Sequence, residues 1–321
     1  MIYSVAVRAM CEFTAKQGDL DLRFTPSPTA QEGISGHMTV VARRGSGYLA
    51  ELPLEGEYLG LQVRGRADGY NPHDNLLEEI KTHRGDIARI PENHRLLHWA
   101  QVKIYGALLC AQYDLEEVDL AVVYFNVLTH AETSFRETFS ASALQAFFEL
   151  HCQRFITWAE QEQAHRLARD ASLGQLRFPH ATFRAGQRQL AESVYRAARD
   201  GHSLMAQATT GIGKTLGTLF PQLKAFPEKQ LDRLFFLTAK TPGRRLALDA
   251  LETLCSQQPK IELRVLEHVA RDKSCEHPDK ACHGDSCPLA KGFYDRLPAA
   301  RQQALDSQWL NQAAVRDAAL A

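Results

Sequence analysis

Residues 208–215 read Ala-Thr-Thr-Gly-Ile-Gly-Lys-Thr, and this stretch indicates the fold more clearly than any other part of the chain. It is a glycine-rich phosphate-binding loop with alanine in place of the usual first glycine. The backbone N–H groups of such a loop, together with the N-terminus of the following helix, cradle the phosphates of a nucleotide. Apolar residues 203–206 and 216–223 predict the strand and the helix that the motif requires on either side.

Each residue type in this loop has a chemical reason to be there. We expect Lys214 to reach the β- and γ-phosphates of ATP and the Thr215 hydroxyl to hold the accompanying Mg²⁺. The predicted ATP contacts within the loop are Thr210, Gly211, Gly213, Lys214 and Thr215.

The composition fits a globular protein of two domains. The chain has 321 residues, of which 45% are apolar and 23% charged, and each half is long enough to bury a core. Because the net charge is −1 at pH 7, any binding of nucleic acid must depend on local patches. The chain has neither a run of 18 apolar residues nor a signal-peptide pattern, so we expect a cytoplasmic protein without a membrane span.

Hydrophobic periodicity and turn residues predict two α/β domains, 1–168 and 183–321, joined by a linker at 169–182. The predicted N-terminal elements are a hairpin of strands 62–70 and 76–82, helix 96–113, strands 118–127 and 133–139, and helix 141–168. The predicted C-terminal elements are helix 185–199, strands 203–207 and 233–238, a helix starting near Pro242, and helical residues 311–321. The pattern does not decide whether 38–43 and 48–54 are strand or helix.

The hairpin carries the second chemical signal. Asp68 lies on its first strand, and Glu79 and Lys81 lie on its second strand, where residues two apart project together. Two converging carboxylates make a hard oxygen site for Mg²⁺ or Mn²⁺. A cation there can activate water and neutralise charge on a phosphodiester, and a neighbouring lysine can stabilise the transition state. The alternative is a solvated strand edge with a cross-strand ion pair.

Two further elements accompany this triplet. Gln101 and Tyr105 are four residues apart on the predicted helix, so they share one face. Upstream, residues 33–37 read Gly-Ile-Ser-Gly-His. With these elements in this order, the segment from about 30 to 130 resembles the RecB-like branch of the PD-(D/E)xK nucleases.

The resemblance implies a mixed central sheet flanked by helices and a metal-dependent DNA exonuclease activity. It implies that His37, Asp68 and Glu79 bind Mg²⁺ or Mn²⁺ and that Lys81 is catalytic. It also implies that Gln101 and Tyr105 support the site or contact DNA. The implied substrate is DNA that is single-stranded or has single-stranded ends.

The second half contains further candidate residues. Arg184 and Gln187 lie about twenty-five residues before the phosphate loop, and a glutamine there can read the adenine edge with two hydrogen bonds. The alternative is an exposed amphipathic helix. After the loop, the apolar run that ends in Ala239-Lys240-Thr241 resembles helicase motif Ia, in which a strand end contacts the backbone of single-stranded DNA.

Three cysteines are crowded into residues 275–287. Cys275, Cys282 and Cys287 are spaced Cys-x6-Cys-x4-Cys, and thiolates this close can hold zinc or an iron–sulfur cluster. In a reducing compartment such spacing favours a metal over disulfides. The fourth ligand is not evident, because Cys255 lies upstream and no cysteine follows the trio. Alternatively, His277 and His283 complete a zinc site.

Residues 178–321 resemble the start of the DinG/XPD-like superfamily 2 DNA helicases. This resemblance implies an incomplete RecA-like P-loop motor domain with a cysteine-rich insertion that holds a [4Fe–4S] cluster. No Asp-Glu-x-His or Asp-Glu-x-Asp sequence follows the loop, so we expect the N-terminal part of a larger nuclease–helicase that binds ATP but does not unwind DNA alone.

The sequence therefore predicts a metal-dependent DNA nuclease joined to the ATP-binding part of a helicase, and the resemblance implies a role in DNA repair or processing. Two alternatives stay open at this point. One is a DNA-binding clamp that does not cut, fused to a helicase fragment. The other is a nucleotide-dependent regulator or adaptor without nucleic-acid chemistry.

Overall fold

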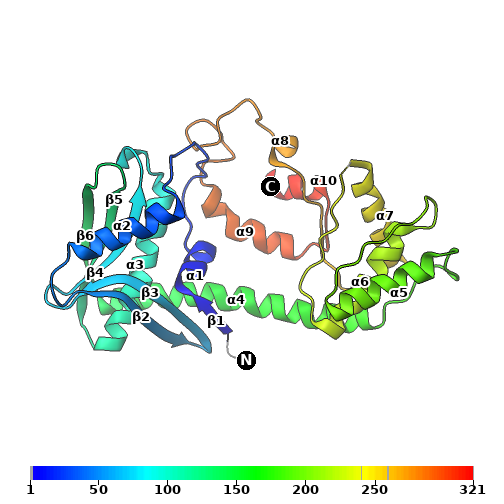
Figure 1. Ribbon diagram of the computed structural model, residues 1–321, viewed down its shortest axis with the longest axis horizontal. Helices are drawn as coiled ribbons and strands as arrows, with labels where there is room; N and C mark the ends of the chain where they lie inside the picture. The colour runs from blue at the N-terminus through cyan, green and yellow to red at the C-terminus, as the bar shows by residue number, and fades with distance from the viewer. Residues whose placement is uncertain (1–2, 240, 259, 321) are drawn as a thin grey trace. The chain divides into compact units, whose positions relative to one another are not determined.

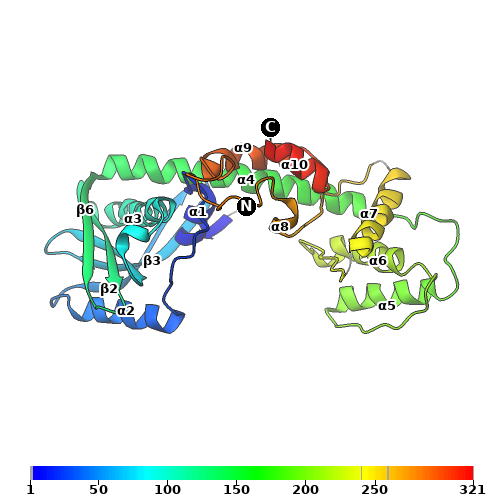
Figure 2. The ribbon, with the colours of Figure 1, turned by 90° about the horizontal axis from the view of Figure 1, so that it is seen from above.

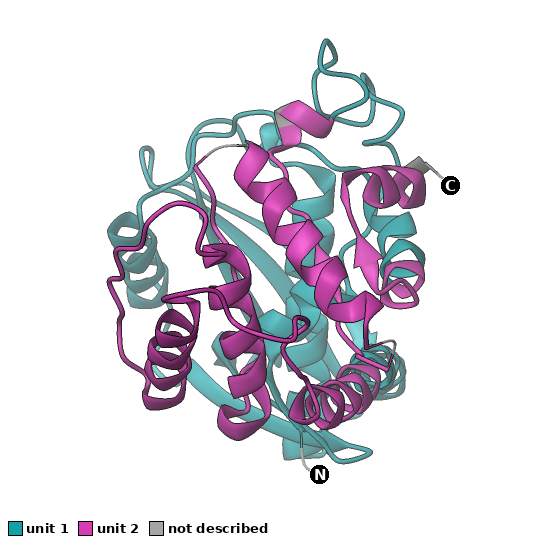
Figure 3. Cartoon of the chain, turned by 90° about the vertical axis from the view of Figure 1, so that its right-hand side faces the viewer, with its two compact units in different colours: residues 1–159, 275–301 teal, residues 160–274, 302–321 magenta. Residues whose placement is uncertain are grey.

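The computed structural model describes residues 3–239, 241–258 and 260–320, which form two compact units (Figure 3). Unit 1 comprises the described residues up to Ala159 together with Cys275–Arg301. Unit 2 comprises the described residues of Glu160–Ser274 and those from Gln302 onward. Lys240, in the predicted motif Ia, lies outside the described residues.

Unit 1 is built on a mixed six-stranded sheet (Figure 1). Its strands are β1 (Tyr3–Ala6), β2 (Leu49–Tyr58), β3 (Leu61–Asn71), β4 (Leu76–His83), β5 (Glu117–Asn126) and β6 (Glu132–Ser140). They lie in the order β1-β3-β4-β5-β6, and β2 also pairs with β3. The β1–β3 and β4–β5 pairs are parallel, and the other pairs are antiparallel.

Helices cover both faces of this sheet. Helix α3 (Glu92–Tyr113) and helix α2 (Ala30–Ala42) lie on opposite sides of it (Figure 2). Leu120 and Val122 of β5 pack in one hydrophobic cluster with α3, α1 (Val7–Thr14) and the first part of α4 (Ala141–Gly174). Ala121 and Val123 pack on the other face in a cluster with Val40 of α2. Burial on both faces explains why β5 is a continuous apolar run rather than an alternating one.

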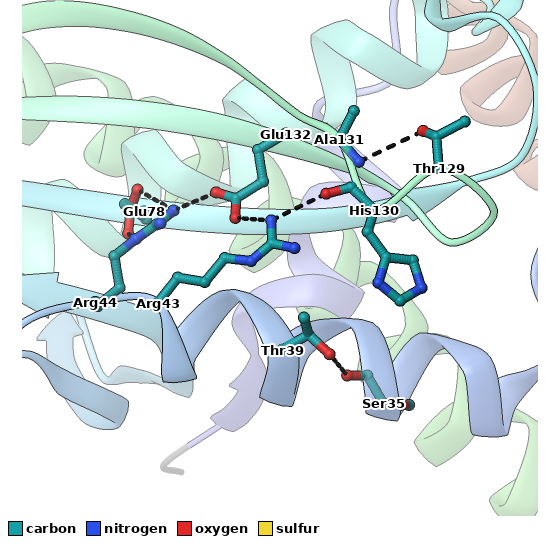
Figure 4. Close-up of polar contacts among 9 residues, drawn as sticks. All are labelled: Ser35, Thr39, Arg43, Arg44, Glu78, Thr129, His130, Ala131 and Glu132. Carbon is teal, nitrogen blue, oxygen red and sulfur yellow. Dashed lines mark hydrogen bonds and ion pairs between the residues drawn. The ribbon is translucent and has the colours of Figure 1, made fainter.

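Ion pairs fix the C-terminal end of α2 against the sheet (Figure 4). Arg44 donates two hydrogen bonds to Glu78 of β4, at 2.8 and 3.0 Å, and one to Glu132 of β6 at 3.0 Å. Arg43 donates to Glu132 at 2.7 Å and to the His130 carbonyl at 3.0 Å. At the other end of the helix, Thr29 and Glu32 form a capping box.

The cysteine-rich segment packs within unit 1. The Leu22 N–H donates to the Cys282 carbonyl at 2.9 Å, and the Leu20 N–H donates to the Ala290 carbonyl at 2.8 Å. Helix α9 (Phe293–Leu305) begins beside these contacts, and the Tyr294 N–H donates to the Gly18 carbonyl at 3.0 Å. The predicted domain boundaries place this segment with the phosphate loop, whereas its hydrogen bonds place it with the N-terminal residues.

Unit 2 is mainly helical. Its elements beyond α4 are α5 (Gln187–Asp200), α6 (Lys214–Lys229), α7 (Thr241–Ser256), β7 (Val265–Leu266), α8 (Arg271–Ser274), β8 (Trp309–Leu310) and α10 (Gln312–Leu320). Leu173 and Leu176, in the predicted linker, are buried in a cluster with Leu216, Leu223 and Phe226. The boundary between the units falls within α4, earlier than the predicted linker.

The two strands predicted in unit 2 do not form. Residues 203–207 and 233–238 have no regular secondary structure and pair with no strand in the described part of the chain. A strand is stabilised by its neighbours, and the only strand pairing among the described residues of unit 2 is β7 with β8. The apolar side chains that suggested these strands stay exposed, with Met205 at 100% and Leu237 at 89%.

The described helices include none that combines the length and the apolar composition needed to cross a membrane.

Arg44→Met tests the contact that holds α2 on the sheet. The change leaves Glu78, which is buried, without its charged partner, so we expect unit 1 to lose about 3–5 kcal/mol of unfolding free energy. Denaturant unfolding followed by circular dichroism measures the loss. Arg8→Met, which removes an exposed ion pair with Glu12, should change stability by less than about 1 kcal/mol. Equal effects of the two variants would contradict this account.

Candidate active site

The pairing of β3 with β4 ends next to Asp68. The two strands are in register at Asn71–Leu76, Tyr70–Leu77 and Gly69–Glu78. One residue further along, Asp68 Oδ2 accepts a hydrogen bond of 2.6 Å from the Ile80 N–H. The carboxylate thus takes the place of a strand carbonyl. This hydrogen bond fixes the side chain through Oδ2 and leaves Oδ1 available to another partner.

The predicted site residues meet in two pairs at this point. Asp68 Oδ1 lies 3.5 Å from His37 Nδ1 on α2. Lys81 Nζ donates a hydrogen bond of 2.5 Å to Glu79 Oε1, within β4. Glu79 is only 5% exposed, which is unusual for a carboxylate. The structure thus places His37 beside Asp68 and Lys81 beside Glu79.

Burial governs the ionisation of the two carboxyls. It raises the pKa of both Glu79 and Asp68, while the Lys81 ammonium acts in the opposite direction on each. Burial and Lys81 both lower the pKa of His37, so its imidazole is neutral at pH 7 and its ring nitrogens can bind a metal. The burial of two carboxylates costs folding free energy when no cation is present. A bound cation would offset that cost by neutralising their charge.

Gln101 and Tyr105 lie on the buried face of α3. Tyr105 packs on the backbone of β3 at Gly65, where a Cβ atom would lie 2.6 Å from the tyrosine hydroxyl. Burial, and then Glu79 and Asp68, raise the pKa of Tyr105, so its hydroxyl keeps its proton and can donate. Gln101 Oε1 is buried and has no hydrogen-bond partner within the described residues.

Sequence reasoning missed His98, which lies one turn before Gln101 on α3. Its Nδ1 is 2.9 Å from the Tyr124 hydroxyl on β5. Burial, with a further contribution from Lys81, lowers the pKa of His98 to about 3, so a neutral imidazole stands near the lysine. The three-residue spacing from Gln101 was the available signal, because such residues share a helix face.

Helix α6 begins at Lys214, directly after the glycines of the phosphate loop, but the strand predicted before the loop does not form. Gly211 and Gly213 have positive φ angles of 89° and 79°, a conformation that favours glycine. Lys214 Nζ donates to the carbonyls of Ala208 and Thr209, at 3.0 and 2.9 Å, so the ammonium lies folded against the loop. Thr210 is exposed and Thr215 is half-buried.

Gln187 holds the phosphate loop in place. It is only 2% exposed, its Oε1 accepts from the Arg184 N–H at 3.0 Å, and its Nε2 donates to the Gly213 carbonyl at 3.0 Å. Arg184 adds a hydrogen bond of 2.7 Å to the Gly211 carbonyl. The predicted adenine contact needs an amide that faces solvent, whereas in this structure both ends of the amide are engaged with the chain.

The three crowded cysteines differ in burial. Cys275 and Cys282 are half-buried in the cysteine-rich segment, and Cys287 is buried. His283 Nδ1 lies 3.7 Å from Asp285 Oδ2. Cys255 and the trio belong to different units. Among the described residues, no group of three or more His, Cys, Asp or Glu side chains has an arrangement that holds a metal ion, either in this segment or around Asp68.

Comparison with protein-family models and with curated proteins gave no match. Among solved structures, the crystal structure of SSO0001 matches 48% of this chain and 77% of its own, with 18% sequence identity and a TM-score of 0.31.

Glu79→Gln tests the cost of the buried carboxylate. Burial raises the folded-state pKa above the unfolded value of about 4.3, so the stability linked to the neutral carboxyl is lost as pH rises through the folded pKa. In EDTA at pH 8, the neutral glutamine should make the variant more stable than wild type, by on the order of 1–3 kcal/mol.

Denaturant unfolding at pH 8 and pH 5 measures this difference, which should shrink at the lower pH. A variant less stable than wild type at pH 8 would show that the ion pair with Lys81 outweighs the burial of the charge.

Gln187→Ala tests the hydrogen bonds by which Gln187 holds the phosphate loop. The change leaves the Gly213 carbonyl and the Arg184 N–H without their partners, at a cost of about 1–3 kcal/mol. We expect faster amide hydrogen exchange across 208–215, measured by mass spectrometry. Gln189→Ala, at an exposed position of the same helix, is the matched control. Unchanged amide hydrogen exchange in Gln187→Ala would mean that the loop keeps its conformation without the Gln187 hydrogen bonds.

Proposed function

We propose that unit 1 is a metal-dependent DNA nuclease of the RecB-like PD-(D/E)xK type. The observation that supports this most strongly is the meeting of Asp68, Glu79 and Lys81 beside the end of the β3–β4 ladder, with His37 facing Asp68. An ordinary ion pair on a solvated strand edge would leave its carboxylate exposed, whereas Glu79 is only 5% exposed.

The residue types at this place suit Mg²⁺ or Mn²⁺, and binding would require them to come closer together than in the described structure. Asp68 Oδ1, Glu79 and a neutral His37 nitrogen are the donors, and hard oxygens are what these cations prefer. A bound cation would activate water and neutralise charge on a phosphodiester. Lys81, released from Glu79, would hold the attacking water or the developing negative charge, and the protonated Tyr105 hydroxyl would donate a hydrogen bond to a phosphate oxygen.

For unit 2 we propose ATP binding at the phosphate loop, in a partial motor domain of the DinG/XPD type. The ordered loop, held by Arg184 and Gln187 at the N-terminus of α6, supports this assignment. Cys275, Cys282 and Cys287 are the candidate thiolates for a [4Fe–4S] cluster, which would require them to come closer together than in the described structure. DNA with single-stranded ends is the proposed substrate, and DNA repair or processing is the proposed context.

Lys81→Ala and Asp68→Asn test the nuclease assignment. On end-labelled DNA with Mn²⁺, wild type should cut, and both variants should lose about 100-fold or more of the cleavage rate, because each removes a group that acts on the reacting phosphate. Lys229→Ala, at an exposed lysine of α6, should cut like wild type. Lys214→Ala should lose ATP binding, measured with a fluorescent analogue.

Full cleavage by Lys81→Ala would contradict the site. If correctly folded wild type does not cut, the result favours a DNA-binding clamp, a function in keeping with the direct Lys81–Glu79 ion pair.

A further inference from the structure

A cavity separate from the candidate active site lies in unit 1, at the N-terminal end of α3. Its volume is about 870 Å³, and it is lined by residues from three segments, within 18–25, 88–99 and 283–285. All three segments belong to unit 1. The wall does not include Asp68, Glu79 or Lys81. Ligand cavities in proteins typically measure about 300–1,000 Å³, so this one has room for a small organic group.

Contacts within the chain hold the first and third segments together around this cavity. The Gly18 N–H donates to Asp295 Oδ1 at 2.9 Å. The Gly292 N–H donates to Asp19 Oδ1 at 2.6 Å. Asp19 also packs so closely on Gly284 that a Cβ atom there would overlap its carboxylate. The cavity therefore does not depend on a ligand for its shape.

The wall contains buried polar atoms that have no partner. Asn93 Oδ1, Arg95 Nε and His283 Nδ1 are buried and lack a hydrogen-bond partner within the described residues, and all three residues line the cavity. Asn93 is only 7% exposed. Native proteins leave few buried polar atoms unsatisfied, because each one costs free energy. Three such atoms around one cavity indicate that it receives a group with hydrogen-bond donors and acceptors.

Aromatic and apolar side chains line the same cavity. Phe24 is 90% exposed, and Trp99 is half-buried on α3. Ile90 and Leu96 also belong to the wall. An exposed phenylalanine leaves water only when a ligand or partner covers it, which is favourable for so large an apolar side chain. Because flat, unpaired bases stack on such rings, Phe24 and Trp99 suit a flat ligand.

The charges of the wall disfavour an anion. The wall has three arginines and four carboxylates, so its net charge is −1 with histidine neutral. One of the arginines, Arg23, is paired with Asp21 at 2.5 Å. A site for phosphate or another anion requires an excess of positive charge. A flat, uncharged group with donors and acceptors fits this wall, and a nucleobase is such a group.

We propose that this cavity binds an unpaired nucleobase. The ring of the base stacks on Phe24 or Trp99. Asn93 Oδ1 accepts a hydrogen bond from an amino or ring N–H, and the Arg95 Nε–H donates to a ring nitrogen or carbonyl. A half-turn of the Asn93 amide exchanges its oxygen and nitrogen, so either can meet the edge of the base. Arg89 is exposed and makes no side-chain hydrogen bond or ion pair in the described part of the chain, so it is available to the attached phosphate.

An unpaired base can come from a free nucleotide or from single-stranded DNA. The choice of DNA rests on the proposed nuclease function, for which the cavity is a second contact with the strand, apart from the cation site. Paired bases of a duplex are stacked and hydrogen-bonded to each other, so they cannot enter the cavity without unpairing.

Fluorescence anisotropy of the full chain in EDTA, where the proposed nuclease does not cut, tests the proposal. One labelled single strand has about 12 nucleotides, and a second of the same length carries abasic positions, so it keeps the phosphates but offers no bases. Wild type should bind the ordinary strand about 10-fold or more tightly than the abasic strand, because stacking requires a base. Equal binding of the two strands by wild type would overturn the proposal.

Phe24→Ala and Asn93→Leu test whether the base lies in this cavity. Each should weaken binding of the ordinary strand by about 5-fold or more and leave binding of the abasic strand unchanged. Phe24 is exposed, so its variant should keep the fold, and Asn93→Leu should unfold at the same temperature as wild type or a higher one, since it removes an unpartnered acceptor. Leu150→Ala, at an exposed apolar position of unit 1 outside the cavity, should bind both strands like wild type. Binding of the ordinary strand at the wild-type level by either cavity variant would overturn the proposal.

Competition with thymidine monophosphate identifies the source of the base. If the base belongs to a strand, the mononucleotide should displace the labelled strand only at concentrations at least about 10-fold above those of unlabelled strand, because a strand makes further contacts. Displacement at equal concentrations would assign the cavity to a free nucleotide and reject DNA as its ligand.

Cleavage with Mn²⁺ distinguishes failure of this inference from failure of the proposed function. If wild type cuts DNA but binds the ordinary and abasic strands equally, only the base-binding cavity is rejected. If wild type binds the ordinary strand through Phe24 and Asn93 but does not cut, the cavity stands and the nuclease assignment fails. If wild type neither cuts nor binds, both are rejected.

Discussion

The hydrogen bond from the Ile80 N–H to Asp68 Oδ2 is the constraint on which the candidate active site depends. It forms where the β3–β4 pairing ends, so a carboxylate completes the hydrogen bonding of a buried strand in place of a backbone carbonyl. The bond fixes Asp68 beside Glu79, and burial then makes the ionised pair costly. Lys81 offsets part of that cost through its ion pair with Glu79. The proposed cation site would account for a sheet that accepts this cost.

The neighbouring contacts keep this arrangement in place. Glu78, one residue before Glu79, is engaged by Arg44 at the end of α2, so the helix that carries His37 is fixed to the strand that carries Glu79 and Lys81. On the other face, α3 places Gln101 and Tyr105 over the sheet, with Tyr105 packed at Gly65. In unit 2, a buried glutamine plays a comparable part, since Gln187 holds the phosphate loop through Gly213. Both sites are thus positioned by buried polar side chains that hydrogen-bond to backbone or to charged partners.

Local patterns predicted the elements of unit 1 well, because apolar periodicity and turn residues act over short distances. Helix 96–113 and strands 118–127 and 133–139 agree closely with α3, β5 and β6. The strands predicted at 203–207 and 233–238 failed, because an apolar extended segment becomes a strand only where a neighbour pairs with it. The packing of the cysteine-rich segment in unit 1 depends on hydrogen bonds from residues 18–22 to residues 282–294, and such long-range contacts leave no local signal.

The central claim is that Asp68 and Glu79, beside Lys81, form a divalent-cation site. Anomalous diffraction from Mn²⁺-soaked crystals of the full chain tests it most directly, because it locates the ion itself. The account predicts a single strong peak in unit 1, within about 2.2 Å of Asp68 Oδ1 and of a Glu79 oxygen, with Lys81 moved off Glu79. No peak at this place at saturating Mn²⁺, with the Lys81–Glu79 ion pair intact, would contradict it.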